Sequence, residues 1–184
     1  MNDIVNETRA IRNLALVGFM GTGKSAVGRQ VAGELGFTFV DTDELIEAYA
    51  GKRISDLFVE DGEPAFRKIE SDVVAELAQR RDAVISTGGG LIVNSDNLAS
   101  LKMHAFVVCL WASPETIFER TRHTSHRPLL QTPDPLARIR ELLAARESAY
   151  RQADVLVSTD FRSIRETAQQ VLHQFHEARR ALAP

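Results

Sequence analysis

The sequence is poor in cysteine, with one residue of this type, Cys109, among 184. A single cysteine cannot form a disulfide within the chain, which is compatible with a reducing compartment such as the cytoplasm. Cys109 lies inside an apolar stretch at residues 106–110, where a thiol is far more often a small core residue than a nucleophile. We therefore expect Cys109 to be buried and to take no part in chemistry.

Long apolar runs are absent as well. No stretch of the sequence approaches the roughly 20 residues that a membrane-spanning helix needs, and the polar start at residues 1–3 lacks the features of a secretion signal. The net charge of −3 gives no sign of the basic surface that binds nucleic acid or an acidic membrane. We therefore expect a cytoplasmic monomer whose partner is a small molecule, with no contacts to nucleic acid or membrane.

Short apolar runs alternate with helical segments along nearly the whole chain. Five runs rich in Val, Leu, Ile and Phe are expected to be strands buried on both faces: 13–17, 37–40, 83–86, 105–110 and 155–157. Seven segments have helical periodicity: 24–35, 43–49, 64–80, 95–102, 114–120, 135–150 and 163–181. This alternation predicts an α/β fold with a parallel sheet and helices on both faces. The length suits one domain, 1–184, in which residues 1–12 are an N-terminal extension without an assigned role.

Three glycines, a lysine and a serine are crowded into Gly18–Ser25, directly after the first expected strand. This segment, GFMGTGKS, satisfies GxxxxGK[ST], and a strand before it and a helix after it are the context that this phosphate-binding loop requires. Lys24 would reach the β- and γ-phosphates, and the Ser25 hydroxyl would coordinate Mg²⁺. The alternative is an ordinary glycine-rich turn. The residues expected to bind a nucleoside triphosphate here are Gly21, Thr22, Gly23, Lys24, Ser25 and Ala26.

A phosphate-binding loop alone does not separate switches, motors and kinases. The sequence contains no base-reading NKxD motif, which a switch GTPase would carry, and it is too short for a second, mechanical domain. Asp41 and Asp43 follow the second expected strand, and the carboxyl ends of parallel strands face the ligand crevice. These carboxylates could serve a metal ion and an incoming hydroxyl. Equally, one of them could merely cap the helix that follows.

Three further segments have a composition that suits ligand contacts. Arg67 and Glu70 are three residues apart on one helix face and can pair, although such pairs are often solvated. Thr87-Gly88-Gly89-Gly90 follows the third strand, where the backbone could approach a ligand closely or simply form a flexible turn. The basic stretch at 122–128 is typical of a mobile surface loop, and it could supply cations around a transferred phosphate or be no more than a solvated loop.

Together, these motifs resemble the shikimate kinase family. The matching segments, in the family's order and at about its spacing, are the phosphate-binding loop, Asp41-Thr42-Asp43, Gly62-Glu63 with Phe66-Arg67 and Glu70, Thr87–Gly90, Arg127-Pro128-Leu129-Leu130, and Arg146 with Tyr150. The resemblance runs from about residue 13 to the last strand. It implies a P-loop NTPase fold of the nucleoside-monophosphate-kinase type. Such a fold has a five-stranded parallel sheet in the order 2-3-1-4-5, substrate-binding helices at about 42–80 and a lid at about 121–134.

The same resemblance implies transfer of the γ-phosphate of ATP to the 3-hydroxyl of shikimate, with Mg²⁺. The implied residues are, for catalysis, Lys24, Asp43 and Arg127; for the metal, Ser25 and Asp41; for the nucleotide, Arg120, Arg127 and Arg162 besides the loop; and, for shikimate, Asp43, Arg67, Gly88, Gly89, Gly90 and Arg146. The guanidinium groups of Arg67 and Arg146 would hold the substrate carboxylate, and Arg127 would lie in the lid. One departure is Ile164, at the place of a proline that packs on adenine in the family. We expect only an apolar contact there.

Two other functions stay open on the sequence. A small kinase of the same architecture could act on gluconate or a nucleoside monophosphate, although Asp43, Arg67 and Arg146 suit a carboxylate-bearing polyol better than a base. A catalytically silent nucleotide-binding module could regulate a partner, but the intact Lys24, Ser25, Asp41 and Asp43 argue against it.

Overall fold

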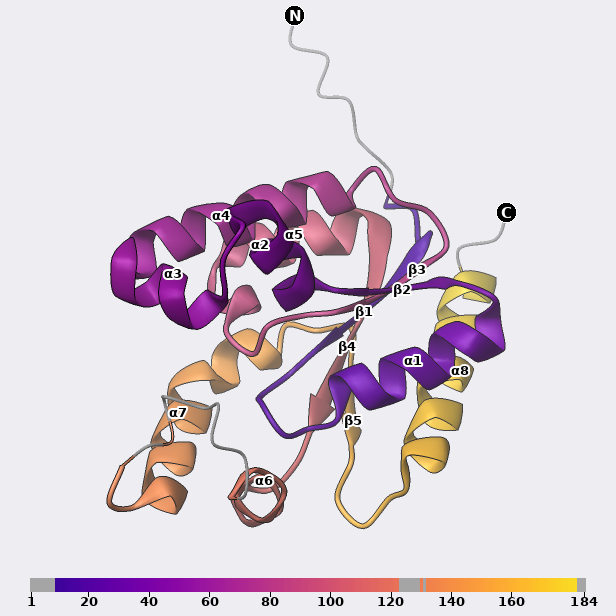
Figure 1. Ribbon diagram of the computed structural model, residues 1–184. Helices are drawn as coiled ribbons and strands as arrows, with labels where there is room; N and C mark the ends of the chain where they lie inside the picture. The colour runs from indigo at the N-terminus through magenta and orange to yellow at the C-terminus, as the bar shows by residue number, and fades with distance from the viewer. Residues whose placement is uncertain (1–8, 123–129, 131, 182–184) are drawn as a thin grey trace, which may run out of the picture.

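The computed structural model describes residues 9–122, 130 and 132–181, and these form a central sheet with helices on both faces (Figure 1). Within this described part the sheet has five strands, all parallel, in the order β2-β3-β1-β4-β5. The strands are β1 (Asn13–Val17), β2 (Thr38–Asp41), β3 (Ala83–Ser86), β4 (Ala105–Trp111) and β5 (Val155–Ser158). Both the strand order and the parallel pairing confirm the predicted fold.

Helices connect the strands in every crossover, and one more helix, α8, follows the last strand. They are α1 (Lys24–Leu35), α2 (Thr42–Ala50), α3 (Ile54–Glu60), α4 (Gly62–Leu77), α5 (Ser95–His104), α6 (Pro114–Thr121), α7 (Pro135–Tyr150), α8 (Ile164–Ala181) and a 3₁₀ turn, η1 (Leu91–Val93). Seven of these were predicted within a few residues of their ends. The short α3 and η1 were not predicted.

Alternate residues of each central strand face two separate cores. Leu14 and Leu16 of β1 pack with α1 and α8, in a cluster that includes Val31 and Phe175. Ala15 and its neighbours on the other face pack with α2 to α7. The strand is therefore apolar throughout, because both of its faces are covered.

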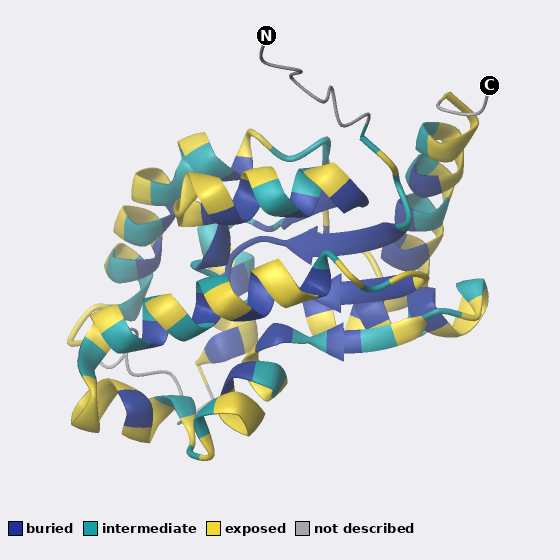
Figure 2. Cartoon of the chain, turned by 90° about the horizontal axis from the view of Figure 1, so that it is seen from above, coloured by how far each residue is buried: buried dark blue, intermediate teal, exposed yellow. Residues whose placement is uncertain are grey.

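Seen from above, the inner strands are buried and the helices around them are striped by exposure (Figure 2). Cys109 of β4 is fully buried, as predicted. Burial raises the pKa of its thiol to about 12, so the group stays protonated near neutral pH. Its place in the core and its protonation together exclude it as a nucleophile.

Several helix ends have recognisable capping residues. Gly36 ends α1 in the left-handed region, with φ of 68°. The Ser113 side chain caps α6 by accepting a hydrogen bond from the Thr116 N–H, and Asp134 caps α7 through the Ala137 N–H. These caps fix where α6 and α7 begin, on either side of the segment that contains the undescribed residues.

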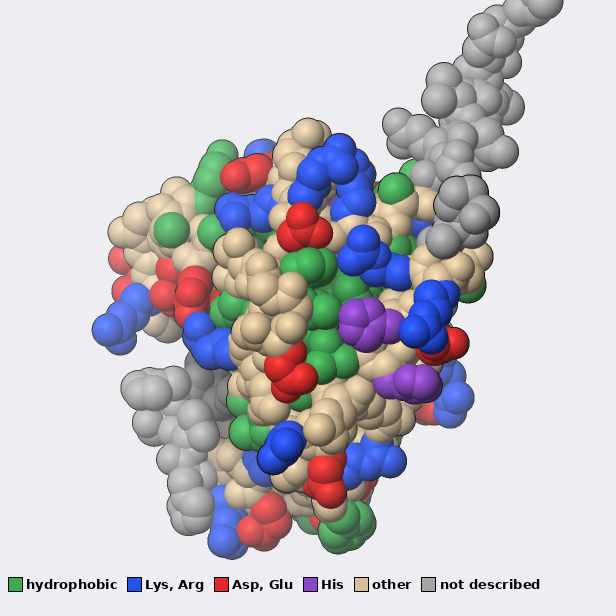
Figure 3. All heavy atoms as spheres, turned by 90° about the vertical axis from the view of Figure 1, so that its right-hand side faces the viewer, with side chains coloured by type: hydrophobic (Ala, Val, Ile, Leu, Met, Phe, Trp, Pro, Cys, Tyr) green, Lys and Arg blue, Asp and Glu red, His purple; other side chains and the backbone are tan. Residues whose placement is uncertain are grey.

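The face that α8 covers has acidic and basic side chains interspersed around a band of apolar ones (Figure 3). Charges of one sign do not gather into a patch on this view. Among the described residues, no helix combines the length and apolar character required for crossing a bilayer.

Candidate active site

The loop between β1 and α1 is held in a shape that only glycine permits at two points. Gly18 has φ of 131°, and a Cβ atom on it would lie 2.2 Å from the Leu110 carbonyl oxygen. Gly23 precedes α1 with φ of 91°, and among the described residues no side chain caps this helix end. The first N–H groups of α1 are therefore available to an anion, and the helix dipole favours one there.

The Lys24 side chain folds back against this loop. Its side chain is buried, at 8% exposure, and Nζ donates hydrogen bonds to the carbonyl oxygens of Gly18 at 2.9 Å and Phe19 at 3.0 Å. Thr22 Oγ1 also donates to the Phe19 carbonyl, at 2.8 Å. These contacts hold the ammonium group at the centre of the loop, where a bound triphosphate would lie.

Three oxygen-bearing side chains meet beside Lys24. Ser25 Oγ donates to Asp41 Oδ2 at 2.9 Å and lies 3.3 Å from Ser86 Oγ. Hydroxyl and carboxylate oxygens are the ligands that Mg²⁺ prefers, and the ion usually takes one or two from protein and the rest from phosphate and water. This donor set fits Mg²⁺ in that mode. An all-protein cage is not present among the described residues, which contain no group of three acidic, His or Cys ligands.

Asp41 has a second contact, which settles one of the questions left by the sequence. Its Oδ1 accepts a hydrogen bond from the Asp43 N–H at 3.1 Å and thereby caps α2. The same carboxylate therefore caps the helix and faces Ser25. Asp43, the second residue of α2, lines a neighbouring cavity.

The glycine turn after β3 lies against Asp43 and Arg67. Its first residue, Gly88, donates its N–H to Thr42 Oγ1 at 2.9 Å. A Cβ atom on Gly88 would lie 2.8 Å from Asp43 Oδ1, and one on Gly90 would lie 3.3 Å from Arg67 Nη1. The absence of side chains on this turn is what allows the carboxylate and the guanidinium to approach it.

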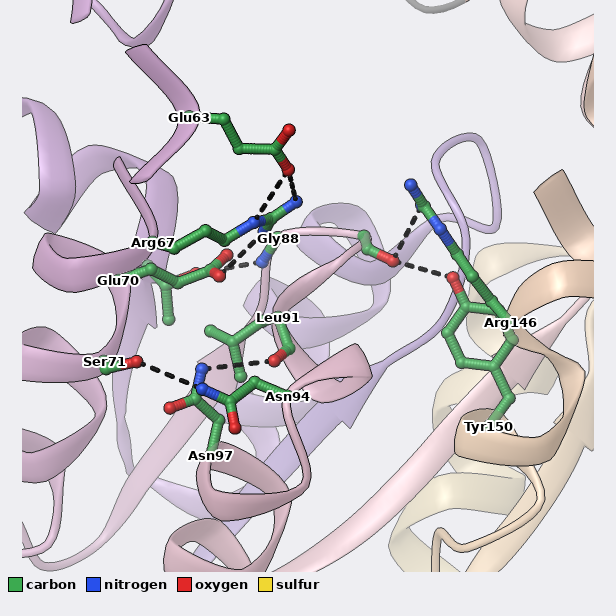
Figure 4. Close-up of polar contacts among 12 residues, drawn as sticks. Glu63, Arg67, Glu70, Ser71, Gly88, Leu91, Asn94, Asn97, Arg146 and Tyr150 are labelled. Carbon is green, nitrogen blue, oxygen red and sulfur yellow. Dashed lines mark hydrogen bonds and ion pairs between the residues drawn. The ribbon is translucent and has the colours of Figure 1, made fainter. Parts of the chain in front are cut away.

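Arg67 is oriented by two carboxylates on its own helix, α4. It donates to Glu63 Oε1 through Nε at 3.2 Å and Nη2 at 3.1 Å, and to Glu70 Oε2 through Nη1 at 2.8 Å (Figure 4). Glu70 is 1% exposed. Burial raises its pKa above the ordinary value, and the ion pair with Arg67 offsets part of that rise. A buried carboxylate of this kind holds the guanidinium in place more firmly than a solvated one.

Arg146 reaches the same turn from the opposite side, on α7. Its Nη1 donates to the Gly89 carbonyl oxygen at 3.3 Å, and Tyr150 Oη donates to the same oxygen at 2.7 Å (Figure 4). The Arg146 guanidinium also lies 5.6 Å from the centre of the Phe19 ring. Two guanidinium groups from distant helices thus flank one glycine turn.

Two neighbouring cavities lie along the phosphate-binding loop. One, of about 330 Å³, is lined by Lys24, Ser25, Asp41, Asp43, Ser86, Thr87, Gly89 and Arg120, together with loop residues 20, 21, 23 and 26. The other, of about 480 Å³, is lined by Arg120, Thr159, Arg162, Ser163, Ile164 and Thr167, together with residues 22, 23, 26 and 27. Because they share Gly23, Ala26 and Arg120, one extended ligand could lie in both.

Arg120 and Arg162 both border the second cavity, and hydrogen bonds hold Arg120 more firmly than Arg162. Arg120 donates to Thr159 Oγ1 at 2.9 Å, to the Thr159 carbonyl at 2.8 Å and to the Gly21 carbonyl at 3.3 Å. Arg162 donates to the Ser158 carbonyl at 3.3 Å and contacts Gln170. Ile164, 49% exposed, supplies the apolar surface expected at its position. The predicted lid residue Arg127 lies outside the described residues.

Sequence reasoning gave no role to several polar residues that complete the site. Ser86 lies at the carboxyl end of β3, where the rule for parallel strands would have found it. Thr42 and Thr159 had no such signal, because each acts by binding the backbone or side chain of a residue far away in the sequence.

Comparisons with known proteins agree with one another. The family model for shikimate kinase matches residues 20–176. A shikimate kinase from Symbiobacterium thermophilum is 45% identical over 168 residues, covering 90% of this chain and 97% of that protein. One from Thermodesulfovibrio yellowstonii is 42% identical over 165 residues, covering 90% and 95%. A solved shikimate kinase from Acinetobacter baumannii, in complex with shikimate, superposes with a TM-score of 0.86 at 38% identity, covering 91% of this chain and 94% of that one.

Proposed function

Because the chain belongs to the shikimate kinase family, it is an ATP-dependent kinase, and we propose that its two cavities hold ATP and shikimate for direct transfer of the γ-phosphate to the 3-hydroxyl. The observation that carries this proposal is the convergence of Arg67, Arg146 and Asp43 on the glycine turn beside Lys24. A carboxylate needs a guanidinium fork, and a transferred phosphoryl group needs cations.

The nucleotide lies along the loop, with its phosphates on residues 21–26 and its base in the second cavity. Lys24 stabilises charge on the β- and γ-phosphates. Arg120 and Arg162 border the base, and Ile164 packs on it. Arg127, outside the described residues, would bring a further cation to the transferred phosphoryl group. Neutralising that charge is the largest contribution that a kinase site can make.

Mg²⁺ is proposed to bind between Ser25 and Asp41, which supply a hydroxyl and a carboxylate oxygen. When bound, it would neutralise phosphate charge and fix the phosphate geometry. Ser86 lies close enough to Ser25 to support this arrangement.

Shikimate is proposed to lie over the glycine turn, with its carboxylate between Arg67 and Arg146. Backbone groups of Gly88, Gly89 and Gly90 would contact the ring. Asp43 accepts the hydrogen bond of the 3-hydroxyl, and it takes up the proton as the oxygen forms its bond to phosphorus and the bond to the ADP oxygen breaks. Because this transfer is direct, no phosphorylated enzyme forms.

We further propose that the protein works in the cytoplasm, where its ATP is supplied. We propose a monomer as the working unit.

The direct test is to measure ADP release with ATP and Mg²⁺ on shikimate, gluconate and nucleoside monophosphates in parallel. Turnover should be confined to shikimate and should need Mg²⁺. Turnover on gluconate alone would assign the related kinase activity instead, and turnover on none of them would favour a silent nucleotide-binding module.

Replacing Arg67 tests the substrate half of the site. Arg67→Ala should raise the shikimate KM roughly tenfold to a hundredfold, because one charge-assisted contact is lost. The ATP KM should change little. Arg151→Ala is the matched control, since that residue pairs with Glu147 on the exposed end of α7, and it should change neither constant. A collapse of ATP binding with intact shikimate binding would refute the assignment of Arg67.

A further inference from the structure

Tyr150 is a buried residue of α7 for which the reaction as proposed has no use. It is 1% exposed, and its hydroxyl donates the shorter of the two hydrogen bonds to the Gly89 carbonyl, at 2.7 Å. Arg146, one helical turn earlier, donates the longer one, at 3.3 Å. Figure 4 shows both side chains extending from the same helix toward one oxygen.

We propose that Tyr150 is a positioning residue for shikimate: by holding the Gly89 carbonyl, it allows Arg146 to leave that oxygen and bind the substrate carboxylate. The inference rests on the proposed role of Arg146. It adds a reason why a tyrosine, rather than a phenylalanine, ends α7 at this point.

The Gly89 carbonyl has two donors, Arg146 and Tyr150, and it can lose one of them without being left unpaired. A carbonyl that is left without a donor in a partly buried site costs free energy, so any ligand that removed its only donor would bind more weakly. With Tyr150 in place, Arg146 can turn toward a ligand while the carbonyl keeps its stronger hydrogen bond. Without the hydroxyl, a carboxylate that drew Arg146 away would leave the Gly89 carbonyl without either donor.

The phenol is suited to a permanent donor role. Burial raises the pKa of Tyr150 to about 12, despite the nearby charge of Arg146. The hydroxyl therefore keeps its proton across the pH range in which a kinase works. Its ring is fixed against Trp111, with ring centres 6.4 Å apart in an edge-to-face arrangement, so the direction of the hydroxyl is fixed as well.

Tyr150→Phe removes the hydroxyl and leaves the ring. Trp111 is the single tryptophan of the chain, so its fluorescence reports ligand binding next to the altered position. The Kd of shikimate should rise about three- to tenfold, the loss of one hydrogen bond, while the Kd of ATP stays unchanged and kcat falls less than KM rises. Tyr49→Phe is the matched control, because Tyr49, the other tyrosine, is 64% exposed. It should change none of these values.

Two further measurements separate positioning from mere support of the fold. The methyl ester of shikimate lacks the charged carboxylate, so its Kd should be nearly the same for Tyr150→Phe and the unaltered protein. In an Arg146→Gln background, adding Tyr150→Phe should weaken shikimate binding less than twofold, because the group through which it acts is gone.

The outcomes distinguish this inference from the function on which it rests. If Arg146→Gln leaves the Kd of shikimate unchanged, the proposed role of Arg146 is wrong. If Arg146→Gln weakens binding and Tyr150→Phe does not, the role of Tyr150 alone is overturned. Equal weakening of shikimate, its ester and ATP, with a lower Tm, would show a structural role only and would also overturn it.

Discussion

At the scale of single residues, Asp41 shows how one side chain ties local structure to chemistry. One of its oxygens caps α2 through the Asp43 N–H, and the other accepts from Ser25. The cap fixes the first turn of α2, and this turn carries the Asp43 side chain. Substituting Asp41 would therefore disturb both a helix end and the proposed metal site. A residue whose substitution removes no side-chain contact makes a cleaner test.

Gly88 is such a residue. Gly88→Ala would put a methyl group 2.8 Å from Asp43 Oδ1, and the flexible end of that side chain would move aside. We expect kcat/KM for shikimate to fall roughly tenfold to a hundredfold, because a small displacement of a reacting group is costly. Tm should change little, since only a side-chain end is displaced.

The control for this substitution is Gly33→Ala on α1, where a new Cβ meets no atom within 4 Å. It should stabilise the protein by about 0.5–1 kcal/mol, as alanine in place of glycine does within a helix, and leave activity unchanged. Steady-state kinetics measure the change in activity of both variants, and urea unfolding measures the change in stability. Full activity in Gly88→Ala would mean that the turn does not lie against a working Asp43.

From the sequence, Asp41 could be either a helix cap or a metal ligand. Residue spacing could not have shown that one carboxylate both caps α2 and faces Ser25. Contacts that depend on distant pairs are harder still to foresee. Tyr150 and Gly89 are 61 positions apart in the sequence, and nothing in the local pattern of α7 indicates the partner. What the sequence did supply was the set of residue types that the reaction needs.

At the scale of elements, segments with a clear apolar face were predictable, and segments held by tertiary contacts were not. The seven predicted helices are present, and the longer of them repeat an apolar face over several turns. The seven-residue α3 depends instead on tertiary contacts. Its Leu57 is buried in the core, and its Phe58 ring lies 4.6 Å from that of Phe66. Packing against α4 therefore stabilises a helix that would be marginal alone.

Asp154 links three elements that meet at the base of the sheet. It accepts from Arg9 at 3.0 Å and from the Val107 N–H of β4 at 2.8 Å, and it lies 3.3 Å from Lys102 of α5. Burial alone would raise the pKa of Asp154, but the hydrogen bonds from Arg9 and Val107 bring it below the ordinary value. Its ionised form is thus favoured by folding.

A depressed pKa fixes the sign of the pH dependence. The stability that Asp154 contributes is present above the unfolded-state pKa of about 3.9 and is lost as pH falls through the folded-state value. Asp154→Asn should therefore lower the free energy of unfolding by about 1.5–3 kcal/mol near pH 7. The difference from the unaltered protein should shrink below pH of about 4.

Urea unfolding at a series of pH values measures this difference. Asp72→Asn is the matched control, because its pair with Lys68 is exposed on α4 and should be worth no more than about 0.5 kcal/mol. A cost for Asp154→Asn that stays constant from pH 7 to pH 3 would mean that its ionisation is not linked to folding.

At the scale of the whole molecule, the parallel sheet brings residues that are far apart in the sequence together at one edge. The loop after β1, the two aspartates at the end of β2 and the glycine turn after β3 all border the first cavity. The α1 and α8 side of the sheet contributes to the second cavity, and α4 and α7 bring Arg67 and Arg146 to the other side. Parallel strands with right-handed crossovers make this meeting a consequence of topology.

Ligand binding should therefore raise the free energy of unfolding of the whole domain. Mg²⁺ should contribute part of that increase. A ligand that binds only the folded chain adds about 2.7 kcal/mol at a concentration one hundred times its Kd. With ADP and Mg²⁺ the urea midpoint should rise, and removal of the ion with EDTA should reverse part of the rise. Ser25→Ala should lose the Mg²⁺-dependent part and keep the rest, because it lacks a metal ligand and keeps the loop.

Ser25 is the better probe than Asp41, since it caps no helix, and Ser148→Ala on the exposed surface of α7 is the control. The control should retain the whole response to Mg²⁺. If Ser25→Ala responds to the ion as fully as the control does, the metal must bind away from the serine hydroxyl. Because phosphate oxygens supply most of the remaining ligands, Mg²⁺ without ADP should stabilise neither protein measurably, and this third arm separates a shared metal–nucleotide site from an independent one.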